Sequence, residues 1–545
     1  MENEKRFSLL NNPWIKVVMK DGTEKEVSLL EIFPLASDIL MLGGELETQN
    51  AAVLRLLLAI MYASFITNSG SDYQRFKVSY EAVDLWESIW KDKKLPTDLI
   101  TSYLNDQEDN FWLIHPTKPF MQSPIAKNGT EYKASKLFGD LSESSNKQRL
   151  FQSKSGESKE RCSFAEAARW LLYLNAYDDT SAKPKAKGLD SPGAGWLGQL
   201  GQIYVRGNDL FETLMLNFCL LKDGEKLWPE GKPYWELNKP AQERERIEFP
   251  KSPVEMLTLR SRWLLLQFNG DDVTGFTLLG GNHFNKEYPL TEQYTVWRPV
   301  RKSSKKDSPV IGYKPRRHNS DRQIWRDFAN FAPVSLETNS PEYWTPGIVA
   351  WIQKLIEEDA LDKNQLLSLT TCSVQYGDKD FFVNDLTGDS FSIHTGLLSK
   401  MSSQWRSRVF EEIRTCEKVA YASGIMAEEI ALASGASGDD VLENANSKGR
   451  EIAYELINEP FRVWIRRITP ENTIIDEKVF DEWHQKAKTI GNQIIQRQES
   501  FSPDDAIFGR TLVIKDQEKH YSLIEASDRF LRTLNSYYPK LGETK

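Results

Sequence analysis

The sequence predicts an α+β protein, with a large mixed N-terminal domain at residues 1–395 and a C-terminal four-helix bundle at residues 396–545. Two observations lead to this fold class. Strand-like hairpins and apolar-patterned helices alternate up to about residue 395, whereas apolar residues recur at helical spacing from Gly396 onward. In addition, 40% of the 545 residues are hydrophobic, which is ordinary for a folded protein, and the length allows roughly two to four domains.

Turn residues and apolar spacing predict the first elements. The segments 14–19 and 24–29 have the composition of strands, and Asp21-Gly22 between them is a typical hairpin turn. The aromatic, proline-broken segment 111–122 is expected to be an ordered loop or a short edge strand. Apolar residues at helical spacing predict helices over 47–65, 80–90 and 164–176.

A strand at 202–205 is predicted to lead into a helix that begins at Leu210. Asp209 is a favourable N-cap residue, and Glu212 lies three positions later, as a capping box requires. Further along, a hairpin is expected over 366–382 with its turn at 377–380. Helices are predicted over 343–358 and, as four antiparallel members of the C-terminal bundle, over 397–434, 438–468, 476–497 and 521–538.

A basic and glycine-rich stretch precedes that strand, with the sequence KPKAKGLDSPGAGWLGQLG from residue 183. Lysines at 183, 185 and 187 favour an anionic partner, and glycines let backbone N–H groups approach a bulky polar one. Phosphate or a DNA groove is therefore the natural partner, and a solvated surface loop is the alternative. Residues 193–198 match the dinucleotide fingerprint G-x-G-x-x-G, but no strand precedes them and no helix starts on them, so we expect no nucleotide cofactor there.

Two other segments have the composition of partner-binding loops. Residues 140–161 are polar apart from Leu141 and the pair Leu150 and Phe151. That pair is either an anchor into the protein core or a finger that meets a partner. Residues 285–326 are markedly basic with interleaved aromatic residues. That mixture suits nucleic-acid contact, and a solvated charged loop is the alternative.

Charge and composition exclude several classes of protein. The net charge of −9 is unusual for a free-standing DNA-binding protein, so any such contact must be a local patch or part of a larger assembly. The four cysteines form no C-x-x-C pair, which indicates buried thiols and no structural zinc. The chain begins without the apolar run of a signal peptide, and the apolar segment 51–66 is too short to span a bilayer. We therefore expect a cytoplasmic protein without membrane contact.

Catalytic motifs are not apparent. The sequence lacks the G-x-x-x-x-G-K-[ST], H-E-x-x-H and G-x-S-x-G patterns. Aspartate pairs at 178–179, 271–272 and 439–440 lie where aspartate commonly caps a helix or forms a turn. A two-metal nuclease needs carboxylates that converge in space, which sequence spacing alone does not exclude.

Four segments, taken in order, resemble the large-subunit (CasA) family of the type I-E CRISPR surveillance complex, Cascade. They are FSLLNNPWIKV from residue 7, GELETQNAAVLRLLLAI from residue 44, HPTKPFMQ from residue 115 and IYVRGNDLFETLMLN from residue 203. The resemblance implies a subunit that is not an enzyme and needs no cofactor. It would read the PAM of target double-stranded DNA from the minor groove, promote strand separation and help to recruit a helicase-nuclease. Its partners would be the crRNA and other Cascade subunits, in line with guided recognition.

The same resemblance implies which residues contact DNA. A glycine loop of the family most nearly matches Gly193, Ala194 and Gly195, and its groove-entering lysine matches Lys286. A mobile loop with an aromatic tip most nearly matches Phe151, Gln152 and Ser153. A strand-separating hairpin tip, which bears glutamine in relatives, falls at Asp378, Lys379 and Asp380 here, with Gln375 before it. Aspartate beside phosphate is unfavourable unless paired. A stand-alone metal-dependent nuclease and a purely structural assembly subunit are the alternative functions.

Overall fold

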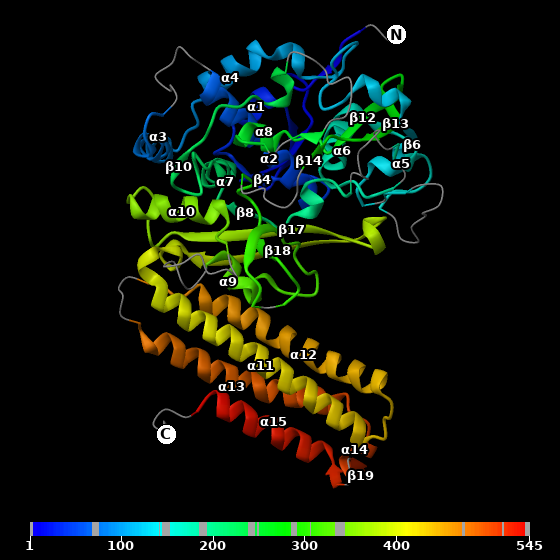
Figure 1. Ribbon diagram of the computed structural model, residues 1–545, viewed down its shortest axis with the longest axis vertical. Helices are drawn as coiled ribbons and strands as arrows, with labels where there is room; N and C mark the ends of the chain where they lie inside the picture. Colours follow the sequence, from blue (N-terminus) through cyan, green and yellow to red (C-terminus); the bar gives the residue numbers. More distant parts are fainter. Residues whose placement is uncertain are drawn as a thin grey trace.

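The computed structural model describes residues 4–67, 76–140, 142–143, 153–181, 183–184, 193–237, 246–247, 250–284, 291–305, 307–332, 344–470, 475–514 and 517–539. A mixed part built of short sheets and helices lies above a bundle of long helices (Figure 1). The long hairpin β17–β18 runs between them across the molecule. The predicted α+β fold class is confirmed.

The predicted N-terminal hairpin is present as β2 (Ile15–Met19) and β3 (Glu24–Val27), and β4 (Ile39–Leu42) extends it to the order β3-β2-β4. The side chain of Asp21 shapes the turn, since its carboxylate accepts the backbone N–H of Thr23 at 2.9 Å. The segment that was expected to be a loop or edge strand contributes β5 (Trp112–Ile114), which pairs with β1 (Arg6–Ser8).

The apolar helix α2 (Glu47–Thr67) is the centre of the mixed part and contacts α4, α6 and α8. Arg55 is tolerated in this buried helix because its guanidinium is paired with the carboxylate of Glu292 at 2.9 Å, and both side chains are buried. The other helices of the mixed part, apart from α7, are α1 (Leu29–Ile32), α3 (Ser79–Asp92), α4 (Thr97–Asp106), α5 (Ala134–Leu137), α6 (Phe164–Tyr177), α8 (Pro253–Leu257), α9 (Phe328–Phe331) and α10 (Gly347–Glu357).

Two larger sheets flank this core. One is built on β12 (Arg262–Asn269) and β13 (Asp272–Gly280), which is paired in turn with β6 (Thr130–Lys133) and β7 (Cys162–Ser163). The other has the order β18-β17-β8, from β8 (Gln202–Arg206), β17 (Leu366–Tyr376) and β18 (Val383–His394). Short pairs complete the part: β9 (Leu221–Lys222) with β10 (Lys226–Leu227), β11 (Arg246–Ile247) with β14 (His283–Phe284), and β15 (Trp297–Arg301) with β16 (Val310–Pro315).

Helix α7 (Leu210–Asn217) begins where it was predicted, with one difference at its cap. The Asp209 carboxylate accepts the backbone N–H of Glu212 at 2.8 Å, as an N-cap should. The capping box was wrong in its second half. The Glu212 carboxylate accepts the backbone N–H of Asn208 at 2.9 Å and so secures the residue that precedes the cap.

Four long helices form the bundle: α11 (Ser403–Ala433), α12 (Asp439–Ile465), α13 (Glu477–Ser500) and α15 (Leu523–Tyr537). They lie side by side in Figure 1, and each contacts the next around a ring. Between α13 and α15 the structure adds α14 (Asp505–Phe508), β19 (Arg510–Ile514) and β20 (Gln517–Tyr521), which the helical pattern did not predict. Within the described residues, no helix is both long enough and apolar enough to cross a membrane.

The first bundle helix begins later than the predicted residue 397. Residues Thr395–Leu398 and Lys400–Ser402 form two short 3-10 turns before α11. Arg406, from the first turns of α11, donates to the carbonyls of Leu397 and Ser399 and so satisfies groups that a continuous helix would have used.

Polar contacts join the bundle to the mixed part. Arg462 of α12 holds the Asp389 carboxylate of β18 with two hydrogen bonds of 2.8 and 2.9 Å. The indole N–H of Trp325 donates to the Asn458 side chain of α12 at 2.9 Å. The sheet β18-β17-β8 is therefore fixed to the bundle along the outer strand β18.

Candidate nucleic-acid interface

Some predicted contact residues lie outside the described part of the chain. These are Phe151, Gln152, Lys185, Lys187 and Lys286. Ser153, at the end of the same predicted loop, is described and exposed, and its hydroxyl donates to the Asp140 carboxylate. The remaining predicted residues are Lys183, the segment 193–195 and the tip 378–380, and the structure places them around one short backbone segment.

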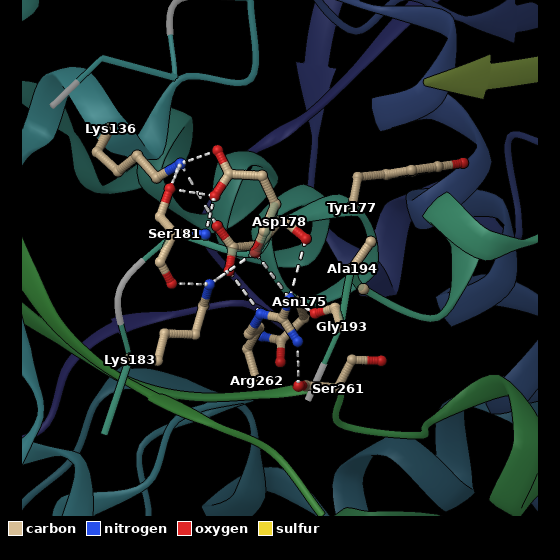
Figure 2. Close-up of polar contacts among 12 residues, drawn as sticks. Lys136, Asn175, Tyr177, Asp178, Ser181, Lys183, Gly193, Ala194, Ser261 and Arg262 are labelled. Atoms are coloured by element: carbon tan, nitrogen blue, oxygen red, sulfur yellow. Dashed lines mark hydrogen bonds and ion pairs between the residues drawn. The ribbon is translucent and has the colours of Figure 1, made fainter. Parts of the chain in front are cut away.

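That segment follows α6 and carries the carboxylates of Asp178 and Asp179. Three cationic side chains from different elements converge on these carboxylates in Figure 2. Lys136 of α5 lies 2.7 Å from Asp179, and Lys183 lies 2.8 Å from Asp178. Arg262, the first residue of β12, lies 2.5 Å from Asp178. We call these five residues the ion-pair cluster; it is buried, and its cations outnumber its carboxylates by three to two.

Burial and charge shift the pKa values of Lys183 and Asp178 within the cluster. Burial lowers the pKa of Lys183 to about 8, and the nearby Asp178 only partly opposes that effect. Burial alone would raise the pKa of Asp178, but Lys183, Arg262 and Lys136 hold it well below its usual value. The carboxylate therefore stays ionised at neutral pH.

The predicted role of Lys183 as an exposed contact needs correction. Its side chain is 2% exposed, and its ammonium also donates to the backbone carbonyls of Asp179 and Ser181, at 2.6 and 2.9 Å. A buried ammonium with three internal partners cannot reach a phosphate in this arrangement. Lys183 instead fixes the start of the basic stretch to the end of α6.

The glycine segment 193–195 lies against the same cluster. Arg262 donates to the carbonyl of Gly193 at 2.6 Å, and Gly193 has a φ of +67°, which favours glycine. The N–H of Gly195 donates to the carbonyl of Asp178 at 2.9 Å. Arg262 also donates to the carbonyls of Asp178 and Asp179, at 3.0 Å each, so one guanidinium ties the glycine segment to the end of α6.

The reason predicted for glycine at position 195 was wrong. Gly195 is buried, and a Cβ atom there would lie 2.3 Å from the carbonyl oxygen of Ala176 and 2.6 Å from its carbon. Glycine is thus required by the close approach to α6, not by the floor of a DNA groove. Ala194 is likewise buried, with its carbonyl accepting from the Gln199 side chain at 2.5 Å. Gly193 is partly exposed.

The hairpin tip between β17 and β18 reaches the same place from the other side. The N–H of Thr180 donates to the carbonyl of Asp380 at 2.8 Å, and its hydroxyl donates to the carbonyl of Lys379 at 2.9 Å. Asp378 and Lys379 are exposed. Residues 178–180 therefore hold the glycine segment through Asp178 and the hairpin tip through Thr180.

An acidic tip is acceptable here because one of its carboxylates is paired. Arg317 binds Asp380 with two hydrogen bonds of 2.6 and 2.8 Å. Burial would lower the pKa of Arg317, but the Asp380 carboxylate raises it overall. The strand end that precedes the tip is also anchored, since the hydroxyl of Tyr376 donates to the carbonyl of Tyr177 at 2.5 Å.

The basic stretch 285–326 divides into two parts with different roles. Its later arginines bind acidic groups of the protein itself: Arg316 and Arg322 lie 3.0 Å from Asp327, and Arg322 also lies 2.8 Å from Glu417 of the bundle. The earlier charges are on the ribbon β15–β16, where Lys302 and Lys305 are exposed. Sequence composition did not separate these parts, because Asp327 lies just beyond the basic stretch and Glu417 is brought in only by the fold.

The residues that hold the site together were not predicted to do so from the sequence, which placed Arg317 in a basic stretch suited to nucleic-acid contact. Thr180, Arg262 and Arg317 come from three segments, and each acts on a partner between 63 and 199 residues away. The one available signal was Arg262, a charged residue that opens an apolar strand. Among the described residues, no group of three or more His, Cys, Asp or Glu side chains is arranged to hold a metal ion.

Comparison with known proteins identifies the family. The family model for the CRISPR-associated protein Cse1 matches residues 8–494. The CasA/Cse1 protein of Thermus thermophilus is 27% identical over 344 residues, an alignment that spans 61% of this chain and 61% of the relative.

Solved structures have the same fold. The crystal structure of Thermobifida fusca Cse1 is 27% identical, with a TM-score of 0.80 over 98% of both chains. A chain of a CRISPR RNA-guided surveillance complex is 15% identical, with a TM-score of 0.64 over 97% of this chain and 100% of that one, which establishes similarity of fold alone. The chain therefore belongs to the CRISPR-associated Cse1 (CasA) family, the large subunits of type I-E Cascade.

Proposed function

We propose that this chain is the non-catalytic DNA-recognition subunit of a type I-E Cascade complex. It reads the PAM in target double-stranded DNA, promotes strand separation and R-loop formation, and helps to recruit the helicase-nuclease. Its partners are the other Cascade subunits and the crRNA. The observation that carries the proposal is the meeting of the glycine segment and the hairpin tip on residues 178–180.

This arrangement supports the proposal for a geometric reason. A subunit that reads the PAM in duplex DNA and opens the adjacent base pairs needs a groove-reading element and a strand-separating element at a fixed spacing. Both elements are hydrogen-bonded to one backbone segment, which sets the spacing between them. The net charge of −9 is compatible with this role, since the guide-bearing complex supplies most of the affinity and the protein reads only a short tag.

The direct contacts in this proposal are the backbone around Gly193, the side chain of Lys379, and the cations and aromatic residue of the loops outside the described residues. Phe151, Gln152, Ser153, Lys185, Lys187 and Lys286 are assigned from the sequence and the family resemblance. Lys183 and Gly195 position these contacts. The minor groove distinguishes base pairs poorly, so the complex is expected to tolerate several related PAM sequences.

The test uses the complete crRNA-bearing complex and a duplex library in which the positions beside a matched target are randomised. Tag-dependent, salt-sensitive binding is expected. Lys286→Ala and Lys379→Ala should each weaken binding and lower the salt slope by about 1 if the lysine contacts phosphate. Lys94→Ala removes an exposed lysine from α3–α4 and serves as the control. Unchanged binding by both test variants would show that the interface is wrongly assigned.

Two alternatives have their own measurements. A stand-alone metal-dependent nuclease would cleave DNA as the pure protein with Mg²⁺ or Mn²⁺ and lose that cleavage on chelation. A purely structural assembly subunit would tolerate deletion of residues 146–159 with normal assembly and unchanged DNA affinity.

A further inference from the structure

Three consecutive residues, Arg260, Ser261 and Arg262, mark the start of β12, and two of them hold the glycine segment. Ser261 and Arg262 lie beside Gly193 in Figure 2, and Arg262 donates to its carbonyl at 2.6 Å. The Ser261 hydroxyl accepts the backbone N–H of Trp196 at 2.9 Å. The third residue, Arg260, has a different set of partners.

The same residues hold the start of the segment that carries Lys286. The N–H of Gly281 donates to the carbonyl of Ser261 at 3.0 Å. The two backbones are in close contact, because a Cβ atom on Gly281 would lie 2.4 Å from the carbonyl oxygen of Arg260. Strand β14 follows at His283–Phe284, and Lys286 comes two positions after it. Arg260 therefore lies between the bases of two segments that contact the duplex under the proposed function.

The guanidinium of Arg260 is held by aromatic rings and one carbonyl. Its central carbon lies 4.8 Å from the centre of the Tyr234 ring and 5.7 Å from that of Trp263. It donates to the carbonyl of Gln122 at 3.1 Å. A guanidinium carries several N–H donors, so most of those on Arg260 have no hydrogen-bond partner in the described part of the chain. The side chain is partly exposed, so a ligand can reach it.

The charge of Arg260 is not balanced in the way that is usual for an enclosed arginine. Burial would lower the pKa of Arg55, for example, but the paired carboxylate of Glu292 raises it overall. Burial lowers the pKa of Arg260, and the nearby Tyr234 opposes that effect only in part. Arginine stays protonated in proteins, so Arg260 is a positive charge without a carboxylate partner among the described residues. An anionic ligand would offset the cost of removing that charge from water.

We propose that Arg260 binds a backbone phosphate of the duplex that carries the PAM, between the glycine segment and the segment of Lys286. The inference rests on the proposed function and adds a direct DNA contact to it. A planar guanidinium can donate two parallel N–H groups to one phosphate, and the flanking rings keep its plane oriented before DNA arrives. A phosphate contact carries no base information. Arg260 therefore fixes the register of the duplex against the segments that read it.

The experiment measures binding of the complete crRNA-bearing complex to duplexes with an intact or a scrambled PAM, over a series of salt concentrations. Arg260→Gln should weaken binding to both duplexes by a similar factor, about tenfold at low salt, and lower the salt slope by about 1. Arg260→Lys keeps the charge and should retain the slope, with a loss of about threefold because an ammonium has no planar fork. Arg532→Gln, which removes an arginine that is 79% exposed on α15, is the matched control.

Two other roles for Arg260 would give different results. If the guanidinium only packs on the rings, Arg260→Gln should lower the thermal transition and leave the salt slope unchanged. Arg260→Met keeps an unbranched side chain beside the rings and should lose the slope as fully as Arg260→Gln if phosphate is the ligand. If Arg260 pairs with a carboxylate of a neighbouring subunit, the variant chain should dissociate from the complex in size-exclusion chromatography. Either of these other results would overturn the proposal.

The outcomes also separate this inference from the proposed function. Wild-type complex without PAM-dependent binding would overturn both. PAM-dependent binding with the same salt slope in Arg260→Gln and wild type would overturn only the role of Arg260. The same conclusion would follow if Arg260→Lys lost as much affinity and as much salt slope as Arg260→Gln, because charge at this position would then not matter.

Discussion

Gly195→Ala is the sharpest test of how the glycine segment is built. The added Cβ would lie 2.3 Å from the carbonyl oxygen of Ala176 and 2.8 Å from the backbone nitrogen of Tyr177. Both are backbone atoms of α6, so they cannot move aside as a flexible side chain would. The segment must shift, and the 2.9 Å hydrogen bond from Gly195 N–H to the Asp178 carbonyl lengthens or breaks.

The expected cost follows from these two effects. Overpacking in a well-packed region costs about 1–3 kcal/mol, and loss of a backbone hydrogen bond adds about 1 kcal/mol. The free energy of unfolding should therefore fall by about 2–4 kcal/mol. At about 2 °C per kcal/mol, the thermal transition of the mixed part should fall by about 4–8 °C. PAM-dependent binding of double-stranded DNA by the assembled complex should weaken as well.

Gly388→Ala is the matched control, measured in the same thermal scan. A Cβ there would meet its nearest atom, the carbonyl oxygen of Thr371, at 3.6 Å, which is an ordinary contact. Its effect should stay within about 0.5 kcal/mol. A Gly195→Ala protein as stable as Gly388→Ala would refute the close packing of the glycine segment on α6.

Three further predictions concern the ion-pair cluster and the junction with the bundle. Asp178→Asn leaves the buried cations with one carboxylate and should cost about 3–5 kcal/mol in urea unfolding, whereas Asp440→Asn, at an exposed helix start, should change little. Burial lowers the pKa of Lys183 from 10.5 to about 8, so the unfolded chain binds more protons between these values. The stability of wild type relative to Lys183→Met should thus rise from about pH 8 to pH 10.5, and a flat or falling difference in unfolding free energy would contradict the burial of that ammonium. Arg462→Lys keeps one nitrogen for the Asp389 carboxylate but loses the donors to the Ser390 carbonyl and the Asn458 side chain. It should lower the stability of the junction by about 1 kcal/mol, seen as earlier unfolding of the bundle in calorimetry.

Local sequence signals were sufficient for elements whose partners are nearby in the chain. Helical apolar spacing predicted α11, α12, α13 and α15, with the main difference at the start of α11. The Asp21-Gly22 turn and the 377–380 turn lie where they were predicted, but the later hairpin was predicted to end at residue 382, and its second strand, β18, extends to His394. The hairpin β19–β20 was missed because only β19 (RTLVI) has a short apolar run, whereas β20 (QEKHY) is polar and has no strand-like apolar pattern.

The candidate site was less predictable because its geometry depends on contacts between distant segments. The sequence around Lys183 reads as an exposed basic loop, and only Arg262 and Lys136, brought in by the fold, show that its carboxylate partners lie in a buried cluster. Asp178 and Asp179 were interpreted as turn residues for the same reason. Glycine at 195 was correctly seen as a sign of close approach, but the approaching group is the protein's own helix.

The hairpin β17–β18 has a mechanical consequence that follows from where it is fastened. One end of the hairpin is the turn at the candidate interface. Further along β18, six positions after Val383, Asp389 is hydrogen-bonded to Arg462 of α12. At about 3.3 Å per residue, some 20 Å of paired strand separates the two points. The paired strands between these two points are expected to move as one unit, because β17 is also paired with β8 in the sheet. Under the proposed function, a neighbouring subunit that tilts the helical bundle would shift the position of the turn relative to the DNA without contacting the nucleic acid itself. By the same coupling, DNA binding at the turn would alter the contact between the bundle and that subunit.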